Sequence, residues 1–204
     1  MITSYLWGTP NGYKVAIALE EMGLDYEINW VNIGTGEQHE PEYLKISPNG
    51  KIPAIVDHET GISLMESGAI LQYLAAKTRQ FGGETPQDRW NVTQWLHWQM
   101  GGLGPMMGQS NHFRGLKAKV PYGETRYKNE TARLFGVLEK QLEGRDYIAG
   151  EYSIADMAAV AWAGMAPMME DDRLTACSNV MAWIERNVAR PATARAIALS
   201  PDLG

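Results

Sequence analysis

The sequence predicts an α/β domain over residues 1–80, followed by an all-α helical bundle over residues 87–204. Three observations predict this division. Before residue 80, short β-branched and aromatic runs alternate with stretches of helical periodicity, whereas after residue 86 only helical periodicity is found. The intervening segment, 81–86, contains two glycines and a proline and is typical of a linker. A chain of 204 residues is long enough for two small domains.

The first three elements form a strand, a helix and a second strand. Residues 2–7 and 26–31 are short apolar runs that predict strands. Between them, the apolar residues of segment 11–22 recur at helical spacing, and Gly23 is a typical helix stop. The apolar residues concerned are Val15, Ala18, Leu19 and Met22. Two strands joined through a helix are expected to lie parallel in one sheet.

The rest of the α/β domain is predicted as a loop, a hairpin and a helix. Segment 34–48 has loop composition, with a short helical turn near residues 41–44. Residues 52–57 and 62–65 predict two strands joined by the turn at 58–61, which makes an antiparallel hairpin. Residues 67–77 then predict a helix whose apolar face carries Ile70, Leu71 and Leu74.

Four helices are predicted in the second domain. Helical periodicity covers residues 87–101, 124–142, 154–166 and 179–190, and Pro191 is expected to close the last of them.

Composition and charge exclude several classes of function. The formal net charge of −6 disfavours nucleic acid as a partner, and no apolar stretch is long enough to span a bilayer. The one cysteine, Cys177, can form neither an internal disulfide nor a Cys-x-x-Cys pair, and the four histidines lack metal-ligand spacing. We expect no metal site and, because no signal peptide is visible, a cytoplasmic location.

Pro53 lies where the third strand is expected to begin. A proline can open a strand simply because it has no ladder donor. Alternatively, the Ile52–Pro53 bond is cis, which would leave the backbone groups of Ile52 free to pair with an extended peptide. The sequence leaves both interpretations open.

Glu66 and Ser67 lie at the expected start of the helix over 67–77. Ser67 can be an ordinary helix cap. The same helix start can also bind a carboxylate through its free amides, while Glu66 accepts an ammonium group. Together the two residues suit the head group of an α-amino acid.

These motifs resemble the glutathione transferases, whose N-terminal domain has a thioredoxin-like fold. The resemblance includes the order β-α-β-β-β-α, Ile52-Pro53, Glu66-Ser67, and a helix-capping box at residues 152–156, so it covers nearly the whole chain. Segments 9–14 and 101–109 are similar to the bacterial nu-class, a disulfide-bond reductase type, and to its fungal nitrogen-regulator-like relatives.

The resemblance implies the site. Thr9 and Asn11 would stabilise the glutathione thiolate, although both residue types are also common helix caps. Ile52 would pair with the cysteinyl backbone, Gln38 and Lys51 would meet the glycyl end, and Glu66 and Ser67 the γ-glutamyl end. Arg133 would reach the neighbouring site of a homodimer. Surface roles for Lys51 and Arg133 stay open.

Two functions follow from this resemblance. The first is an enzyme that uses glutathione as substrate or co-substrate, either to reduce a small disulfide or to conjugate an electrophile, with disulfide reduction as the stronger activity. The alternative is a non-enzymatic glutathione-binding regulatory module, as some fungal relatives are. Those relatives carry a long polar extension, which is not visible here before the first strand, and this favours the enzyme.

Overall fold

The computed structural model describes residues 1–200, and this part of the chain divides into two compact units. The first comprises residues 1–80 together with the segment that begins at Arg190, and the second comprises residues 81–189. The division near residue 80 lies where the sequence places the linker. The C-terminal segment differs from the expected helical domain of 87–204, because its helix belongs to the first unit. Residues 201–204 of that expected domain lie outside the described residues.

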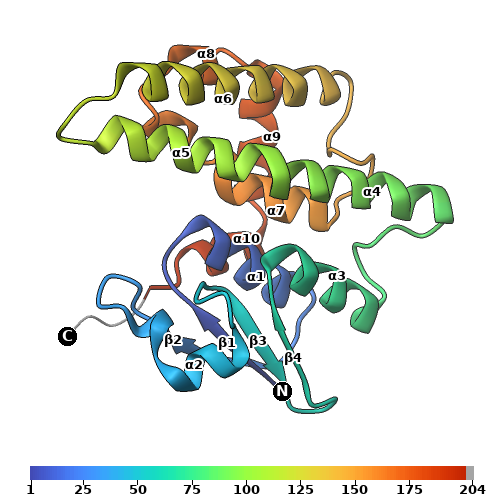
Figure 1. The fold of residues 1–204 in the computed structure, drawn as a ribbon. Coiled ribbons are helices and arrows are strands. Elements are labelled where there is room, and N and C mark those ends of the chain that lie inside the picture. Colours follow the sequence, from blue (N-terminus) through green and yellow to red (C-terminus); the bar gives the residue numbers. More distant parts are fainter. Residues whose placement is uncertain (201–204) are drawn as a thin grey trace. The chain divides into compact units, whose positions relative to one another are not determined.

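The first unit is built on a four-stranded sheet with the order β2-β1-β3-β4 (Figure 1). Its elements are β1 (Ile2–Leu6), α1 (Pro10–Glu21), β2 (Tyr26–Trp30), the 3-10 helix η1 (Glu37–His39), α2 (Pro41–Ile46), β3 (Ala54–Asp57), β4 (Ile62–Met65), α3 (Ser67–Thr78) and α10 (Pro191–Ile197). Strands β1 and β2 are parallel, and β3 is antiparallel to both β1 and β4. The predicted parallel pair and the predicted hairpin are therefore confirmed.

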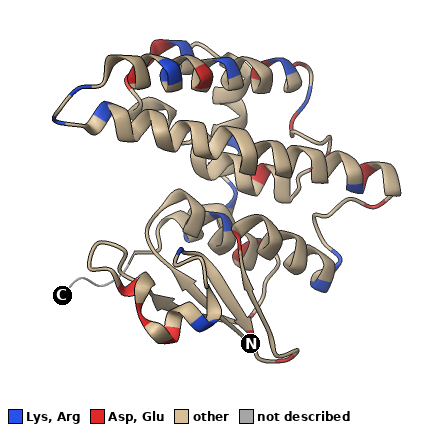
Figure 2. Ribbon diagram, viewed as in Figure 1, with Lys and Arg blue, Asp and Glu red and all other residues tan. Residues whose placement is uncertain are grey.

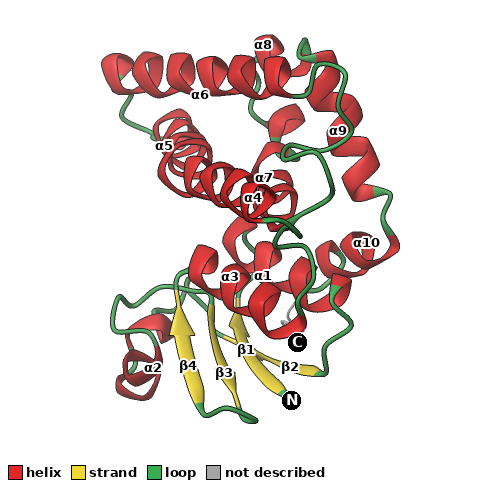
Figure 3. Ribbon diagram, turned by 90° about the vertical axis from the view of Figure 1, so that its right-hand side faces the viewer, coloured by secondary structure: helices red, strands yellow, loops and turns green. Residues whose placement is uncertain are grey.

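Helices cover both faces of this sheet, with α1 and α3 on one side and α2 on the other (Figure 3). Along β1, Ile2 and Leu6 are buried, whereas the half-buried Tyr5 packs against Tyr43 of α2 on the opposite face. Alternation of side chains along a strand explains this distribution. This mixed four-stranded sheet with helices on both faces agrees with the thioredoxin-like fold expected for the N-terminal domain.

Helix α10 was not predicted as an element. Pro191 ends α9, as expected, but it also occupies the first turn of α10, where a missing amide hydrogen costs nothing. Helix α10 packs beside α1, and Arg190 and Arg195 form ion pairs with Glu21 and Glu20 at the C-terminal end of α1. These contacts join the end of the described chain to the first unit.

The second unit is entirely helical. Its elements are α4 (Pro86–Trp98), the π-helical turn η2 (Gln99–Leu103), α5 (Gly104–Gly115), α6 (Pro121–Gln141), α7 (Ile154–Ala163), the 3-10 helix η3 (Ala166–Met168), α8 (Asp172–Thr175) and α9 (Ser178–Val188). Helices α5 and α6 run side by side (Figure 1), and basic and acidic residues are interspersed along α6 (Figure 2). No helix within residues 1–200 is long and apolar enough to cross a membrane.

Candidate functional site

Three of the sequence motifs meet at one edge of the sheet. Because β1 and β3 are antiparallel, the C-terminal end of β1 lies beside the start of β3, with Tyr5 paired to Ala54. The C-terminal end of β4 lies at the same level, since Ala54 also pairs with Met65. The turn into α1, the Ile52–Pro53 segment and the Glu66–Ser67 segment therefore leave the sheet at the same edge.

The turn between β1 and α1 is closed by a tight contact at Gly12. A Cβ atom at this position would lie 2.3 Å from the Trp7 carbonyl oxygen, so only glycine allows the first turn of α1 to pack against residue 7. The Thr9 amide donates to the Trp7 carbonyl at 2.7 Å, and the Thr9 carbonyl accepts from the Tyr13 amide at 3.0 Å. The backbone around Thr9 is thereby fixed.

Thr9 is the N-cap residue of α1, but its side chain makes no capping hydrogen bond. The common structural role of a threonine at this position is therefore not the one observed. Thr9 and Asn11 are both half-buried, and Asn11 lies in the first turn of the helix. Their side chains flank the positive end of the α1 dipole, which favours a negative charge.

The Ile52–Pro53 peptide bond is cis, which decides between the two interpretations of this proline. Strand β3 begins at Ala54, two residues later than expected. The carbonyl of Lys51 accepts hydrogen bonds from the Tyr43 hydroxyl at 2.7 Å and from the Ser47 hydroxyl at 2.8 Å. Helix α2 thus anchors the backbone that leads into Ile52.

Gln38 lies beside this segment. Gly50 has a φ of +61°, and a Cβ atom there would lie 3.4 Å from the Gln38 carbonyl oxygen, so η1 closely approaches the residue before Lys51. The Gln38 amide nitrogen lies 3.4 Å from the Ile33 carbonyl, while its Oε1 atom is shielded from solvent and has no hydrogen-bond partner among residues 1–200. Lys51 is exposed.

Glu66, not Ser67, is the N-cap residue of α3, so of the two interpretations of Ser67 the ordinary helix cap is not the one observed. Ser67 is the first helical residue and is buried, and the Glu66 side chain makes no capping hydrogen bond. Glu66 has a φ of 69° and a ψ of 111°, a conformation that costs a non-glycine residue about 1–3 kcal/mol. The strained backbone turns the chain into α3 directly after β4.

A residue that the sequence analysis did not select also belongs to this edge. Lys14 of α1 is only 2% exposed, and its ammonium nitrogen lies 3.5 Å from the Ser67 hydroxyl oxygen. Burial lowers the pKa of Lys14 from 10.5 to about 7, and the nearby Glu66 carboxylate acts in the opposite direction. In the sequence, the feature that could have indicated Lys14 is its spacing: it lies one helical turn after Asn11 and so on the same helix face.

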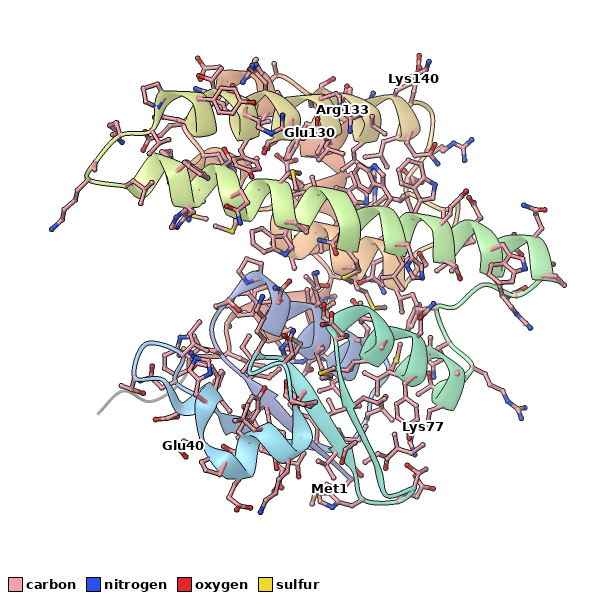
Figure 4. The ribbon with its side chains drawn as sticks, in the orientation of Figure 1. Met1, Glu40, Lys77, Glu130, Arg133 and Lys140 are labelled. Carbon is pink, nitrogen blue, oxygen red and sulfur yellow. The ribbon has the colours of Figure 1, made fainter. Side chains whose placement is uncertain are left out.

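Arg133 lies in the second unit, on α6, and is exposed. Its guanidinium donates two hydrogen bonds to the Glu130 carboxylate, at 2.7 and 2.8 Å, from one helical turn away (Figure 4). Both residues line a cavity of about 600 Å³ on α5 and α6. The other lining residues are Met106, Tyr122, Thr125, Arg126, Tyr127 and Asn129.

The described residues contain no group of three or more histidine, cysteine or acidic side chains that could hold a metal ion. Among the residues selected from the sequence, those of the first unit lie on segments that meet at the sheet edge. They are Thr9, Asn11, Gln38, Lys51, Ile52, Glu66 and Ser67. We define this region as the sheet-edge site.

Comparison with known families identifies the chain. The glutathione S-transferase N-terminal domain family matches residues 2–76, and the corresponding C-terminal domain family matches residues 117–191. The chain belongs to the glutathione S-transferase family. The sheet-edge site lies within the N-terminal match.

Relatives of this glutathione S-transferase match it over nearly its full length. It is 47% identical over 211 residues to the disulfide-bond oxidoreductase YfcG of Escherichia coli, covering 100% of this chain and 97% of the relative. A Burkholderia graminis glutathione transferase, solved with two glutathione molecules per subunit, is 42% identical with a TM-score of 0.93, covering 100% and 89% of the two chains. A Pseudomonas putida glutathione transferase, solved with one glutathione disulfide per subunit, is 38% identical with a TM-score of 0.89, covering 98% and 92%.

Proposed function

We propose that this protein is a glutathione-dependent disulfide-bond oxidoreductase, with conjugation of electrophiles as a weaker activity of the same site. The observation that carries the proposal is the convergence of the α1 start, Ile52 and the α3 start at one sheet edge, in a chain 47% identical to a relative named as a disulfide-bond oxidoreductase. The glutathione bound in one bacterial relative and the glutathione disulfide bound in the other support the same reaction class.

Activation of the glutathione sulfur is the role we assign to Thr9 and Asn11. A thiol reacts as its thiolate, and hydrogen-bond donors at a helix N-terminus lower the pKa of a thiol. The Thr9 hydroxyl is not used as a helix cap, so it is suited to donate to the sulfur. Several donors directed at one anion act as an oxyanion hole does.

The remaining groups of the tripeptide would be bound around this sulfur. The Ile52 backbone, held through Lys51 by Tyr43 and Ser47, would pair with the cysteinyl unit. Gln38 and Lys51 would meet the glycyl carboxylate. The start of α3 with Ser67 would bind the γ-glutamyl carboxylate, and Glu66 its ammonium group.

The reaction consumes two glutathione molecules for each disulfide. The first thiolate attacks one sulfur of the substrate disulfide, forms a mixed disulfide and releases one substrate thiolate, which takes up a proton. A second glutathione thiolate attacks the glutathione sulfur of that mixed disulfide, and the second substrate thiol leaves. The products are two substrate thiols and one glutathione disulfide, so sulfur, protons and electrons balance.

Cys177 is not suited to supply the attacking sulfur. It is the one cysteine of the chain, it lies in the second unit, and its thiol is half-buried with its sulfur 3.4 Å from the Arg173 carbonyl. Burial, followed by the nearby Glu139 carboxylate, raises the pKa of this thiol and so disfavours its thiolate. The nucleophile is therefore glutathione.

A pair of steady-state assays tests the proposal. Reduction of 2-hydroxyethyl disulfide, followed through glutathione disulfide formation, should depend on glutathione and exceed the conjugation of a chlorinated aromatic. The Cys177→Ala variant should retain at least about half of the disulfide turnover, because burial and Glu139 already disfavour a thiolate at this position. Loss of turnover in folded Cys177→Ala would contradict a glutathione-only mechanism. Glutathione binding without either turnover would favour the regulatory module instead.

We further propose that the protein acts as a homodimer in the cytoplasm. The α5–α6 surface combines an exposed aromatic side chain, Tyr122 at 77%, with Met106 and two arginines around the cavity described above. Such exposed aromatic and arginine-rich surfaces are typical of protein interfaces. Within the dimer, Arg133 would contribute to the glutathione site of the other subunit. A single cysteine suits a reducing compartment.

A further inference from the structure

Lys14 is a buried lysine, and its burial disfavours the charged ammonium form of the side chain. Its side chain is 2% exposed, yet it lies on α1 one helical turn after Asn11 and 3.5 Å from the Ser67 hydroxyl oxygen. Removing an ammonium group from water is costly unless an anion or several acceptors compensate it. Strongly perturbed titratable groups of this kind concentrate at functional sites.

Among the described residues on elements packed against α1, Glu66 is an acidic group that acts on Lys14. Glu66, at the start of α3, raises the pKa of Lys14 against the larger effect of burial. The other charged groups are engaged elsewhere. Lys77 of α3 pairs with Asp57 and Glu59, and the two arginines at α10 pair with the two glutamates that end α1.

We propose that Lys14 is a specificity-determining residue whose ammonium group recognises the α-carboxylate of the γ-glutamyl unit of glutathione, next to Ser67. The proposal rests on the proposed function, which brings that carboxylate to the start of α3. It adds a positive charge from α1 to a subsite otherwise composed of the α3 amides and the Ser67 hydroxyl.

An α-amino acid head group carries both charges, and the surroundings of Ser67 offer both complements. The Glu66 carboxylate matches the ligand ammonium, and Lys14 matches the ligand carboxylate. With a pKa of about 7 in the free protein, Lys14 is largely neutral at pH 8. An anion bound beside it favours the ammonium form, so binding of the γ-glutamyl carboxylate takes up a proton.

Proton uptake can be measured by titration calorimetry at pH 8 in two buffers, phosphate and Tris, that differ in ionisation enthalpy. The probe is S-methylglutathione, because it lacks a thiol whose own ionisation would mask the result. A matched ligand replaces the γ-glutamyl α-carboxylate with hydrogen. We expect uptake of about one proton with the first ligand and none with the second.

Two substitutions at Lys14 and a matched control complete the test. Lys14→Met should lower the affinity for S-methylglutathione about tenfold or more, remove proton uptake, and reduce the preference for the ligand with the carboxylate to the part that the α3 amides and Ser67 supply. Lys14→Arg should keep the preference without proton uptake, because arginine remains ionised at this pH. Lys45→Met, at an exposed lysine of α2 paired with Glu42, should change none of these three quantities.

The outcomes distinguish this inference from the proposed function. Unchanged affinity, proton uptake and ligand preference in Lys14→Met would overturn the inference while leaving glutathione binding intact. Binding of S-methylglutathione by the wild type without proton uptake would also overturn it. A wild-type protein that binds neither ligand would overturn the proposed function and this inference together. Thermal unfolding of Lys14→Met at or above the wild-type temperature would exclude misfolding as the cause of weaker binding.

Discussion

Thr9 and Asn11 occupy the turn in which β1 passes into α1, where Gly12 holds the first helical turn against the Trp7 carbonyl. This rigidity matters because a donor stabilises a developing charge best when it is already in place. The Thr9 hydroxyl is also not used as a helix cap. At the scale of single residues, thiolate stabilisation is therefore the testable role of this turn.

Asn11→Ala should raise the pKa of bound glutathione and lower disulfide turnover at neutral pH about tenfold or more, because a hydrogen bond to a charged partner contributes about 1.5–3 kcal/mol. The loss should shrink as pH rises, since the thiolate then forms without help. The measurement is the pH–rate profile of turnover. Thr9→Ala should act in the same direction, and the double variant should be less than additive if both donors serve one sulfur.

A purely structural role for Asn11 would have a different signature. The thermal unfolding temperature of Asn11→Ala would fall, while the midpoint of its pH–rate profile would stay at the wild-type value. An unchanged midpoint would remove Asn11 from the set of catalytic residues.

The element scale shows how α3 is fixed against the sheet whose edge carries the site. Asp57, the last residue of β3, is fully buried and accepts a hydrogen bond from the Tyr73 hydroxyl at 2.6 Å. Lys77, near the end of α3, forms ion pairs with Asp57 and Glu59. Burial alone would raise the pKa of Asp57, but the hydrogen bonds from Tyr73, Lys77 and the Glu59 amide together lower it to about 2.

The lowered pKa of Asp57 predicts that the free energy of unfolding depends on pH. A carboxyl group whose pKa is lower in the folded than in the unfolded state stabilises the fold above its unfolded pKa of about 3.9. That contribution is lost as pH falls through the folded value of about 2. Wild type should therefore exceed Asp57→Asn by about 2 kcal/mol in unfolding free energy at pH 7, and the difference should approach zero near pH 2.

Urea unfolding of both proteins between pH 7 and pH 2 provides the measurement. Glu42→Gln is the control, because Glu42 forms an exposed ion pair with Lys45 that contributes little to stability. A wild-type advantage over Asp57→Asn that stays constant across this pH range would show that the lost contacts, not the charge of Asp57, account for the difference.

The elements that the sequence predicted are those with a clear period, such as β1, α1 and the β3–β4 hairpin. Helix α5 was missed because the glycines of segment 101–108 are typical of turns. In the structure these glycines provide space: a Cβ atom at Gly104 would lie 2.6 Å from the Gln99 amide nitrogen, and one at Gly108 would lie 3.2 Å from the Trp162 ring. The need for glycine at these positions is evident only from the neighbouring side chains, Gln99 and Trp162, and not from the sequence.

The same limit applies to the site. Ile52 precedes a proline that can form a cis bond, and Ser67 follows an acidic residue at a predicted helix start. Both patterns indicate a binding role, so the sequence could identify these two residues. The spacing of Lys14 from Asn11 alone could not identify it, because a lysine in an amphipathic helix is normally placed on the solvated face. Its burial depends on where α3 packs, which is a property of the tertiary structure.

At the scale of the whole molecule, activity is expected to depend on two features: the folding of both compact units and the association of two subunits. Arg190 and the helix that follows it return to the first unit, so removal of the C-terminal segment would expose the face of α1 that α10 covers. The second unit carries Arg133 and the α5–α6 cavity. If the protein is a homodimer, sedimentation at micromolar concentration should give twice the chain mass of 22.7 kDa.

A mixture of two impaired variants tests whether Arg133 acts across that dimer. Asn11→Ala and Arg133→Ala should each lower disulfide turnover when assayed alone. In a mixed dimer, the Arg133→Ala subunit keeps an intact Asn11 and would receive Arg133 of the partner subunit. One of the two sites of the mixed dimer is then complete. Refolding the variants together should therefore restore up to about a quarter of wild-type turnover, because a statistical mixture contains half heterodimers, each with one active site. If Arg133 served its own subunit, every site in the mixture would carry a defect and turnover would stay at the average of the two variants.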